Sequence, residues 1–155
     1  MFLRLIVIFL FAASLTLGQS VHHRHRARAS ARRPHPVVTA RSSELVRLAG
    51  KLRAQGATVA VTGEKVTQPF FSVSGRIIKL NGEALQVLEY ASPSAADADA
   101  SRVSADGTTI STSKPTWLAT PHFFKSGKVI VLYIGGNQTT INLLRTVLGN
   151  QFAGG

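Results

Sequence analysis

Apolar and polar residues alternate in the middle of the chain with the two-residue period of a β-strand. Residues 76–80 and 83–90 flank Asn81-Gly82, a pair that favours a type I′ hairpin turn because both central residues need positive φ. This turn predicts that Leu80 pairs with Glu83, and that Ile78 pairs with Leu85. Both faces of the hairpin carry apolar residues, so we expect both to be at least partly covered.

A second hairpin is predicted from residues 121–125 and 128–134, with Ser126-Gly127 as its turn. That turn would pair Phe124 with Val129. Weaker patterns at 58–61, 68–73 and 109–120 favour short strands, although Pro69 and Pro115 interrupt the last two.

Three segments have the period and the end signals of helices. The first begins near Ser42 or Ser43 as a cap, and the second begins at Ser92-Pro93 and runs to about Val103. The third follows Gly135-Gly136-Asn137 and stops at Gly149. The apolar stripes of the first and third helices are formed by Leu45, Leu48, Ala49, Leu52, Ile141, Leu144, Val147 and Leu148.

Adjacent hairpins require antiparallel pairing. Residues 42–155 are therefore predicted to form a small α+β domain. We expect an antiparallel sheet of four or five strands, built from the two hairpins, with the three helices packed mainly on one face.

The amino terminus is typical of a secretory signal peptide. Arg4 precedes an apolar run over residues 5–17 that only Ser14 and Thr16 interrupt, and small residues follow it. The run is short for a membrane span, which needs about 20 residues. We predict a signal peptide over residues 1–20 and an exported protein, periplasmic or secreted; the alternative is a membrane anchor formed by uncleaved residues 2–18.

The chain also contains a strongly basic segment after the predicted signal peptide. The chain of 155 residues has a formal net charge of +11, and residues 21–41 hold six Arg, four His and no acid. This segment has no apolar period, so it is predicted to be a disordered arm. It also has no aromatic residue for base stacking, so any nucleic-acid contact would ignore sequence. The candidate polyanion-binding residues are Arg24, Arg26, Arg28, Arg32 and Arg33.

The start of the arm suggests a metal site. Cleavage after Ser20 would leave Val21-His22-His23 at the mature end. The free amine, two backbone nitrogens and an imidazole could form a square-planar set for Cu(II) or Ni(II). His22 and His23 are the candidate ligands, and the alternative is that they only keep the arm solvated.

Candidate chemistry in the domain is sparse. The absence of Cys excludes thiolate metal sites and a thiol nucleophile, and no phosphate-binding or dinucleotide motif predicts a cofactor. His122 is the only His after residue 41 and is expected to be packed. Asp97 and Asp99 should point to different sides of their helix. The aromatic residues, including Phe70, Phe71, Trp117, Phe123 and Phe124, favour core packing over an apolar groove.

Several short stretches carry a resemblance. They include Gln68-Pro69-Phe70-Phe71-Ser72-Val73, Arg102-Val103-Ser104-Ala105-Asp106-Gly107, Pro121-His122-Phe123-Phe124, and the segment 148–155. Over about residues 54–155 the chain resembles an uncharacterised family of small exported bacterial proteins, many of them lipoproteins. The resemblance implies an envelope or secreted location and no known activity. Gln19 stands where a lipoprotein has Cys, so no lipid anchor is expected.

These patterns favour an exported, non-enzymatic domain that binds an unidentified ligand, protein or envelope component. The alternatives are polyanion binding through the 21–41 arm and metal binding at the mature amino terminus. We expect a monomer with no transmembrane segment after cleavage.

Overall fold

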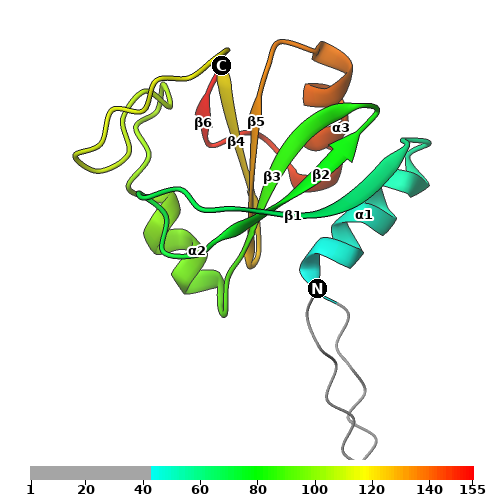
Figure 1. The fold of residues 1–155 in the computed structure, drawn as a ribbon, viewed down its shortest axis with the longest axis horizontal. Helices are drawn as coiled ribbons and strands as arrows, with labels where there is room; N and C mark the ends of the chain where they lie inside the picture. The colour runs from blue at the N-terminus through cyan, green and yellow to red at the C-terminus, as the bar shows by residue number, and fades with distance from the viewer. Residues whose placement is uncertain (1–42) are drawn as a thin grey trace, which may run out of the picture. The chain divides into compact units, whose positions relative to one another are not determined.

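The computed structural model describes residues 43–155. This part of the chain is an α+β domain (Figure 1). Its elements, in chain order, are α1 (Glu44–Ala54), β1 (Val59–Val66), β2 (Gly75–Leu80), β3 (Glu83–Glu89), α2 (Pro93–Ala100), β4 (Pro121–Ser126), β5 (Val129–Ile134), α3 (Gln138–Leu148) and β6 (Ala153–Gly154).

All six strands form one antiparallel sheet in the order β1-β2-β3-β5-β4-β6. The β2–β3 hairpin has the predicted register, with Leu80 opposite Glu83 and Ile78 opposite Leu85. Asn81 and Gly82 have φ values of 51° and 90°, as a type I′ turn requires.

The register of the β4–β5 hairpin was predicted incorrectly. Ser126 pairs with Val129, and Phe124 pairs with Val131 rather than Val129. The two turn residues are Gly127 and Lys128, of which only Gly127 has positive φ, at 55°. A type II′ turn needs positive φ at its first central residue alone, so Gly takes that place and Ser126 stays in the strand. The shift of two positions leaves every side chain on its predicted face.

Both faces of the sheet are covered, which corrects the prediction that the three helices pack mainly on one face. α1 and α3 lie on one side, and α2 lies on the other with the connections around it (Figure 1). The sheet therefore separates two hydrophobic cores, one on each face. Side chains along β4 alternate between them: Phe124 packs beneath α1 and α3, whereas Phe123 packs on the α2 side. Ala96 and Ala100 let α2 approach the sheet closely.

The sheet has six strands rather than four or five, although two of the predicted strands do not form. Residues 68–73 form turns and bends, and Phe70 and Phe71 are both buried in the same core on the α2 side, whereas consecutive residues of a strand point to opposite faces. Residues 109–120 form a long connection with only isolated bridges at Ile110. β1 is longer than the predicted strand at 58–61, and β6 is a two-residue strand that no sequence pattern predicted.

The helix ends follow the predicted signals. Ser43 caps α1, Ser92 caps α2 with Pro93 at its first position, and Asn137 caps α3. α2 ends at Ala100, three residues earlier than expected. Within residues 43–155, no helix is both long enough and apolar enough to cross a membrane.

Candidate functional site

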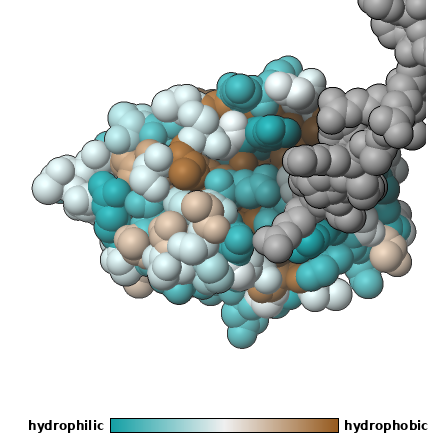
Figure 2. Space-filling model, turned by 90° about the horizontal axis from the view of Figure 1, so that it is seen from below, coloured by the Kyte–Doolittle hydropathy of each residue, from teal (hydrophilic) through white to brown (hydrophobic). Residues whose placement is uncertain are grey.

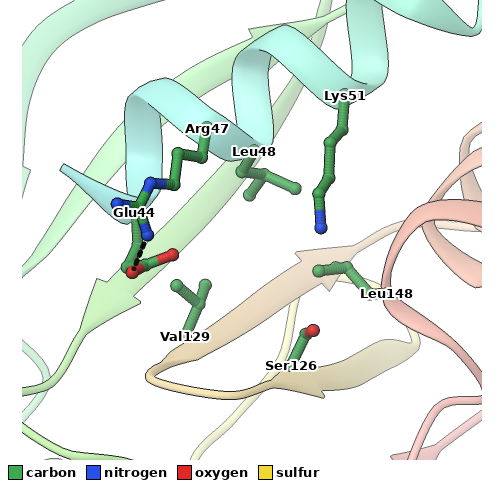
Figure 3. A pocket seen from close by; sticks show the side chains of 7 residues that line it. All are labelled: Glu44, Arg47, Leu48, Lys51, Ser126, Val129 and Leu148. Atoms are coloured by element: carbon green, nitrogen blue, oxygen red, sulfur yellow. Dashed lines mark hydrogen bonds and ion pairs between the residues drawn. The ribbon is translucent and has the colours of Figure 1, made fainter. Parts of the chain in front are cut away.

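Three surface pockets in the described part of the chain border the start of α1. One lies between α1, the β4–β5 hairpin and α3, and has a volume of about 160 Å³ (Figure 3). We call it the α1 pocket, and it is lined by Glu44, Arg47, Leu48, Lys51, Ser126, Val129 and Leu148. A wider hollow of about 470 Å³ shares Glu44 and Arg47 with it and extends to Glu89 and Lys128.

Two side chains fix the amino end of α1 above these pockets. The Val46 amide donates to Ser43 Oγ at 3.4 Å, and the Glu44 amide donates to Glu89 Oε1 at 2.6 Å. Glu89 is the last residue of β3, so the sheet supplies a carboxylate to the positive end of the helix dipole. The helix start is therefore tied directly to the sheet.

The α1 pocket combines cationic groups with an apolar floor. Arg47 donates to Glu44 Oε1 at 2.9 Å, whereas the Lys51 amine points into the pocket towards the β4–β5 hairpin (Figure 3). Among the described residues, no ion pair to Lys51 is formed. The floor is made by Leu48 and Val129, each 4 % exposed, with Leu148 beside them.

One face of the domain is mixed in polarity. Figure 2 shows small, separate apolar patches among polar residues on the face seen from below, where the domain is not covered by grey atoms. No large continuous apolar area is visible there. The lining of the α1 pocket is itself mixed, with Leu48, Val129 and Leu148 beside Lys51, so a ligand would combine a small apolar part with a polar or charged group.

A buried polar network lies on the opposite face, around Asp99 of α2. The Asp99 carboxylate is 4 % exposed and accepts hydrogen bonds from the Ser72 amide at 2.8 Å, Ser72 Oγ at 2.8 Å, Tyr90 Oη at 3.0 Å and Arg102 at 3.1 Å. Burial raises the pKa of Asp99, but these hydrogen bonds outweigh it and hold the pKa below its ordinary value. Burial, together with the bond to Asp99, raises the pKa of Tyr90 far above its ordinary value.

This network holds the fold together. It joins α2 to the 68–74 connection and to Tyr90 at the end of β3, because the Ser72 and Tyr90 donors converge on Oδ2. Asp97 points away from it and pairs with Lys125 of β4 at 2.6 Å, so the prediction that the two acids do not form a paired site is confirmed. The sequence analysis did not predict the role of Asp99. The helical period places Asp99 on the same face as Ala96 and Ala100, and this position could have indicated a buried carboxylate.

Asp106 forms hydrogen bonds with residues next to it in the chain. Its carboxylate accepts from Ser104 Oγ at 2.6 Å and from the amide and hydroxyl of Thr108 at 3.1 and 2.8 Å. These hydrogen bonds lower the pKa of Asp106 to about 2. The three residues form a turn on the surface.

His122 is packed, as expected. It is 6 % exposed, stacks on Tyr133 with 5.9 Å between the ring centres, and places Nδ1 2.9 Å from Gln151 Oε1. Gln151 in turn donates to the Gly154 carbonyl at 2.7 Å. The histidine therefore helps to hold the last residues against β4, and it does not border the three pockets described above.

The predicted aromatic core is confirmed. Phe70, Phe71, Trp117 and Phe123 meet edge-on, with ring centres 5.1 to 6.5 Å apart. The Gly135-Gly136 turn likewise leads to an Asn cap, because Asn137 Oδ1 accepts from the amides of Thr139 and Thr140. That bonding occupies amides that an anion would need.

The candidate residues of the amino-terminal segment lie outside residues 43–155. They are His22 and His23 for metal, and Arg24, Arg26, Arg28, Arg32 and Arg33 for polyanions. The structure therefore leaves both sites as predictions.

The chain was compared with protein-family models, with curated proteins and with solved structures, and none of the three comparisons gave a match. The resemblance to small exported bacterial proteins therefore stays a prediction from the sequence.

Proposed function

We propose that this chain is an exported, non-enzymatic binding protein whose folded domain takes a ligand at the α1 pocket. The observation that carries the proposal is the Lys51 amine, directed into a pocket whose floor is Leu48 and Val129. Export is supported by the signal-peptide pattern of residues 1–20. The location would be the bacterial periplasm, the envelope or the medium.

The chemistry of the pocket favours a small aliphatic carboxylate. An ammonium group attracts the carboxylate, and the Leu48–Val129–Leu148 floor receives a few methylene groups. A volume of about 160 Å³ is below the usual range of pockets for larger organic ligands. Two sources share this chemistry: a free short-chain acid, and the carboxyl end of a peptide whose last residue is aliphatic.

Binding is favoured over catalysis because the buried ionisable side chains serve the fold. Asp99 accepts hydrogen bonds from Ser72, Tyr90 and Arg102. His122 is held between Tyr133 and Gln151. Neither faces the α1 pocket, whereas a catalytic acid or base must reach a substrate proton.

Titration by nuclear magnetic resonance tests the proposal. Hexanoate, added to the exported chain, is expected to shift the resonances of Leu48, Val129 and Leu148 with a dissociation constant of about 1 mM or weaker. N-acetyl-glycyl-leucine and its carboxyl amide form a second arm, which distinguishes a peptide end from a free acid. In either arm the neutral partner, hexanol or the amide, should bind more weakly.

Two matched variants sharpen this test. Lys51→Met keeps the aliphatic stem and removes the charge, so it should weaken carboxylate binding about fivefold, as expected for an ion pair of about 1 kcal/mol. Lys65→Met, at an exposed position of β1, should leave hexanoate binding unchanged. Equal binding of hexanoate and hexanol, or a Lys51→Met variant that binds hexanoate like the unchanged chain, would exclude the α1 pocket as a carboxylate site.

A second candidate function is polyanion binding through residues 21–41. One feature of the domain favours it: Arg47, Lys51 and Arg53 are exposed on α1, so basic residues continue beyond the arm. The six arm Arg residues could neutralise about six phosphates, so log affinity for duplex DNA should fall against log salt with a slope no steeper than about −5. Deleting residues 21–41 should remove this binding, and retention of it would refute the role of the arm.

A further inference from the structure

A pocket of about 200 Å³ lies on the face of the sheet that α1 covers. It is lined by Leu45, Ser74, Arg76, Val87 and Glu89, and we call it the β2 pocket. Its floor is apolar, because Leu45 of α1 and Val87 of β3 are only 2 % and 1 % exposed and belong to the core beneath α1 and α3. The β2 pocket shares no lining residue with the α1 pocket, so a ligand here is independent of the proposed function.

Opposite charges border this floor without meeting. Arg76 pairs with Val87 across the β2–β3 hairpin, and Glu89 lies two residues beyond Val87 on the same face of β3. Arg76 and Glu89 are therefore diagonal neighbours, at a separation that long side chains can bridge. Within residues 43–155, neither of them forms an ion pair. The pocket thus keeps a cation and an anion apart.

The start of α1 holds the Glu89 carboxylate in its place. Glu89 Oε1 accepts from the Glu44 amide at 2.6 Å, which ties this oxygen to the positive end of the helix. Among the described residues, the other oxygen, Oε2, has no donor. Glu89 therefore serves the fold with one oxygen and can accept a hydrogen bond from a ligand with the other.

A second cation stands beside Arg76. Lys65 of β1 pairs directly with Arg76, so both side chains leave the sheet on the same face. Like charges in directly opposite positions destabilise a sheet, and no acid of the described chain forms an ion pair with either residue. An anion between the two cations would offset their repulsion. The Arg76 end of the β2 pocket is therefore suited to a carboxylate.

We propose that the β2 pocket binds a free α-amino acid with a small aliphatic side chain. The carboxylate lies against the planar guanidinium of Arg76, which suits it geometrically, and the ammonium donates to Glu89 Oε2. The side chain rests on Leu45 and Val87. An amino acid carries its amine and its carboxylate on one carbon, whereas a peptide carries them at opposite ends. The free amino acid therefore fits the short span between diagonal neighbours.

Titration of the exported chain with L-valine, followed through methyl resonances, tests the proposal. Isovalerate has the same skeleton without the amine, and isobutylamine has it without the carboxylate. We expect valine to shift the Leu45 and Val87 resonances with a dissociation constant of about 1 mM. Each analogue should bind about fivefold more weakly, because each lacks one of the two ion pairs.

Two variants assign the charges. Arg76→Met should weaken valine binding about fivefold but should not weaken binding of isobutylamine, which has no carboxylate. Glu89→Gln keeps an oxygen for the Glu44 amide, so it should weaken valine binding by a similar factor but should not weaken binding of isovalerate. Lys79→Met is the matched control, since Lys79 is exposed on the same strand but on its opposite face, and it should bind valine like the unchanged chain.

Three results would overturn the proposal. The first is equal affinity for valine and isovalerate, which would mean that no amine is recognised. The second is an Arg76→Met variant that binds valine as tightly as Lys79→Met does. The third is a valine titration that leaves Leu45 and Val87 unshifted; shifts at Leu48 and Val129 alone would assign valine to the α1 pocket. Retained binding of the analogue shows that each variant is folded, because an unfolded chain would lose every ligand.

Discussion

Replacing Asp99 by Asn tests how much the buried network contributes to stability. The change keeps the shape of the side chain and removes its charge. Asp99 accepts four hydrogen bonds, two from Ser72 and one each from Tyr90 and Arg102. The Ser72 amide, Ser72 Oγ and Tyr90 Oη all donate to Oδ2, so the amide oxygen of Asn can take that place while its NH₂ group faces Arg102. The three buried hydrogen bonds then lose their charged acceptor, and the Arg102 contact is lost.

The expected loss follows from that count. Hydrogen bonds to a charged acceptor contribute about 1.5–3 kcal/mol each and neutral ones about 0.5–1.5 kcal/mol, so the three buried bonds that lose the charge carry most of the cost. The Arg102 contact is partly exposed, at 42 % for that side chain, and adds little. We therefore expect Asp99→Asn to lower the free energy of unfolding by about 2–4 kcal/mol at neutral pH.

Urea unfolding measured across pH provides the assay. The folded pKa of Asp99 is lowered, so its contribution is fully present above the ordinary Asp pKa of about 3.9 and is lost as pH falls through the lower folded value. Asn has no such dependence. The difference between Asp99→Asn and the unchanged chain should therefore shrink below about pH 4.

The control is Asp97→Asn, also on α2, which removes the ion pair with Lys125 of β4; the Asp97 side chain is 59 % exposed. An exposed ion pair contributes about 0–1 kcal/mol, so this variant should unfold almost like the unchanged chain. The reasoning about Asp99 is refuted if the two variants cost the same, or if the cost of Asp99→Asn is constant from pH 7 to pH 3.

Three further predictions follow from single positions. Gly82→Val should cost about 1–3 kcal/mol of unfolding free energy, because a β-branched residue is strained at φ 90°; an unchanged melting midpoint would contradict the turn assignment. Gly154→Ala should destabilise the edge formed by β4 and β6, since the added methyl group would overlap the Pro121 carbonyl, and hydrogen exchange should show loss of protection at Gly155 but not in β2. If cleavage occurs after Ser20, the exported chain should bind one Cu(II) through its free amine and His23; acetylation of the amine should remove this binding, and unchanged affinity would mean that the site does not exist.

The β2–β3 hairpin could be predicted down to its residue pairs because Asn81-Gly82 permits one turn type only. Ser126-Gly127 is less specific, since a glycine can occupy either central position, and the pairing was placed two residues away. The starts of the helices could also be predicted from the sequence. The caps Ser43, Ser92 and Asn137 form local hydrogen bonds that depend only on neighbouring residues.

Features that depend on distant residues could not be predicted. Residues 68–73 are read as a strand from their apolar content, but the Ser72 amide donates to Asp99, which is 27 positions away in the chain. Phe70 and Phe71 pack with Ala96 and Ala100 of α2 in the core opposite α1 and α3, and no local pattern indicates that face. The α1 pocket likewise combines Lys51 with Ser126 and Leu148, and no local pattern links these three segments.

The pairing of β3 with β5 has a consequence for the order of folding. Each hairpin closes over a two-residue turn, whereas Glu89 and Val129, which pair across the centre of the sheet, are 40 positions apart. Closing that loop costs entropy before any contact forms, so both hairpins should form early and their docking should limit the folding rate. Mutations in the β3–β5 ladder should slow folding, while changes in the 101–120 connection should act mainly on unfolding. That connection can therefore accept new residues for new contacts without slowing the assembly of the sheet.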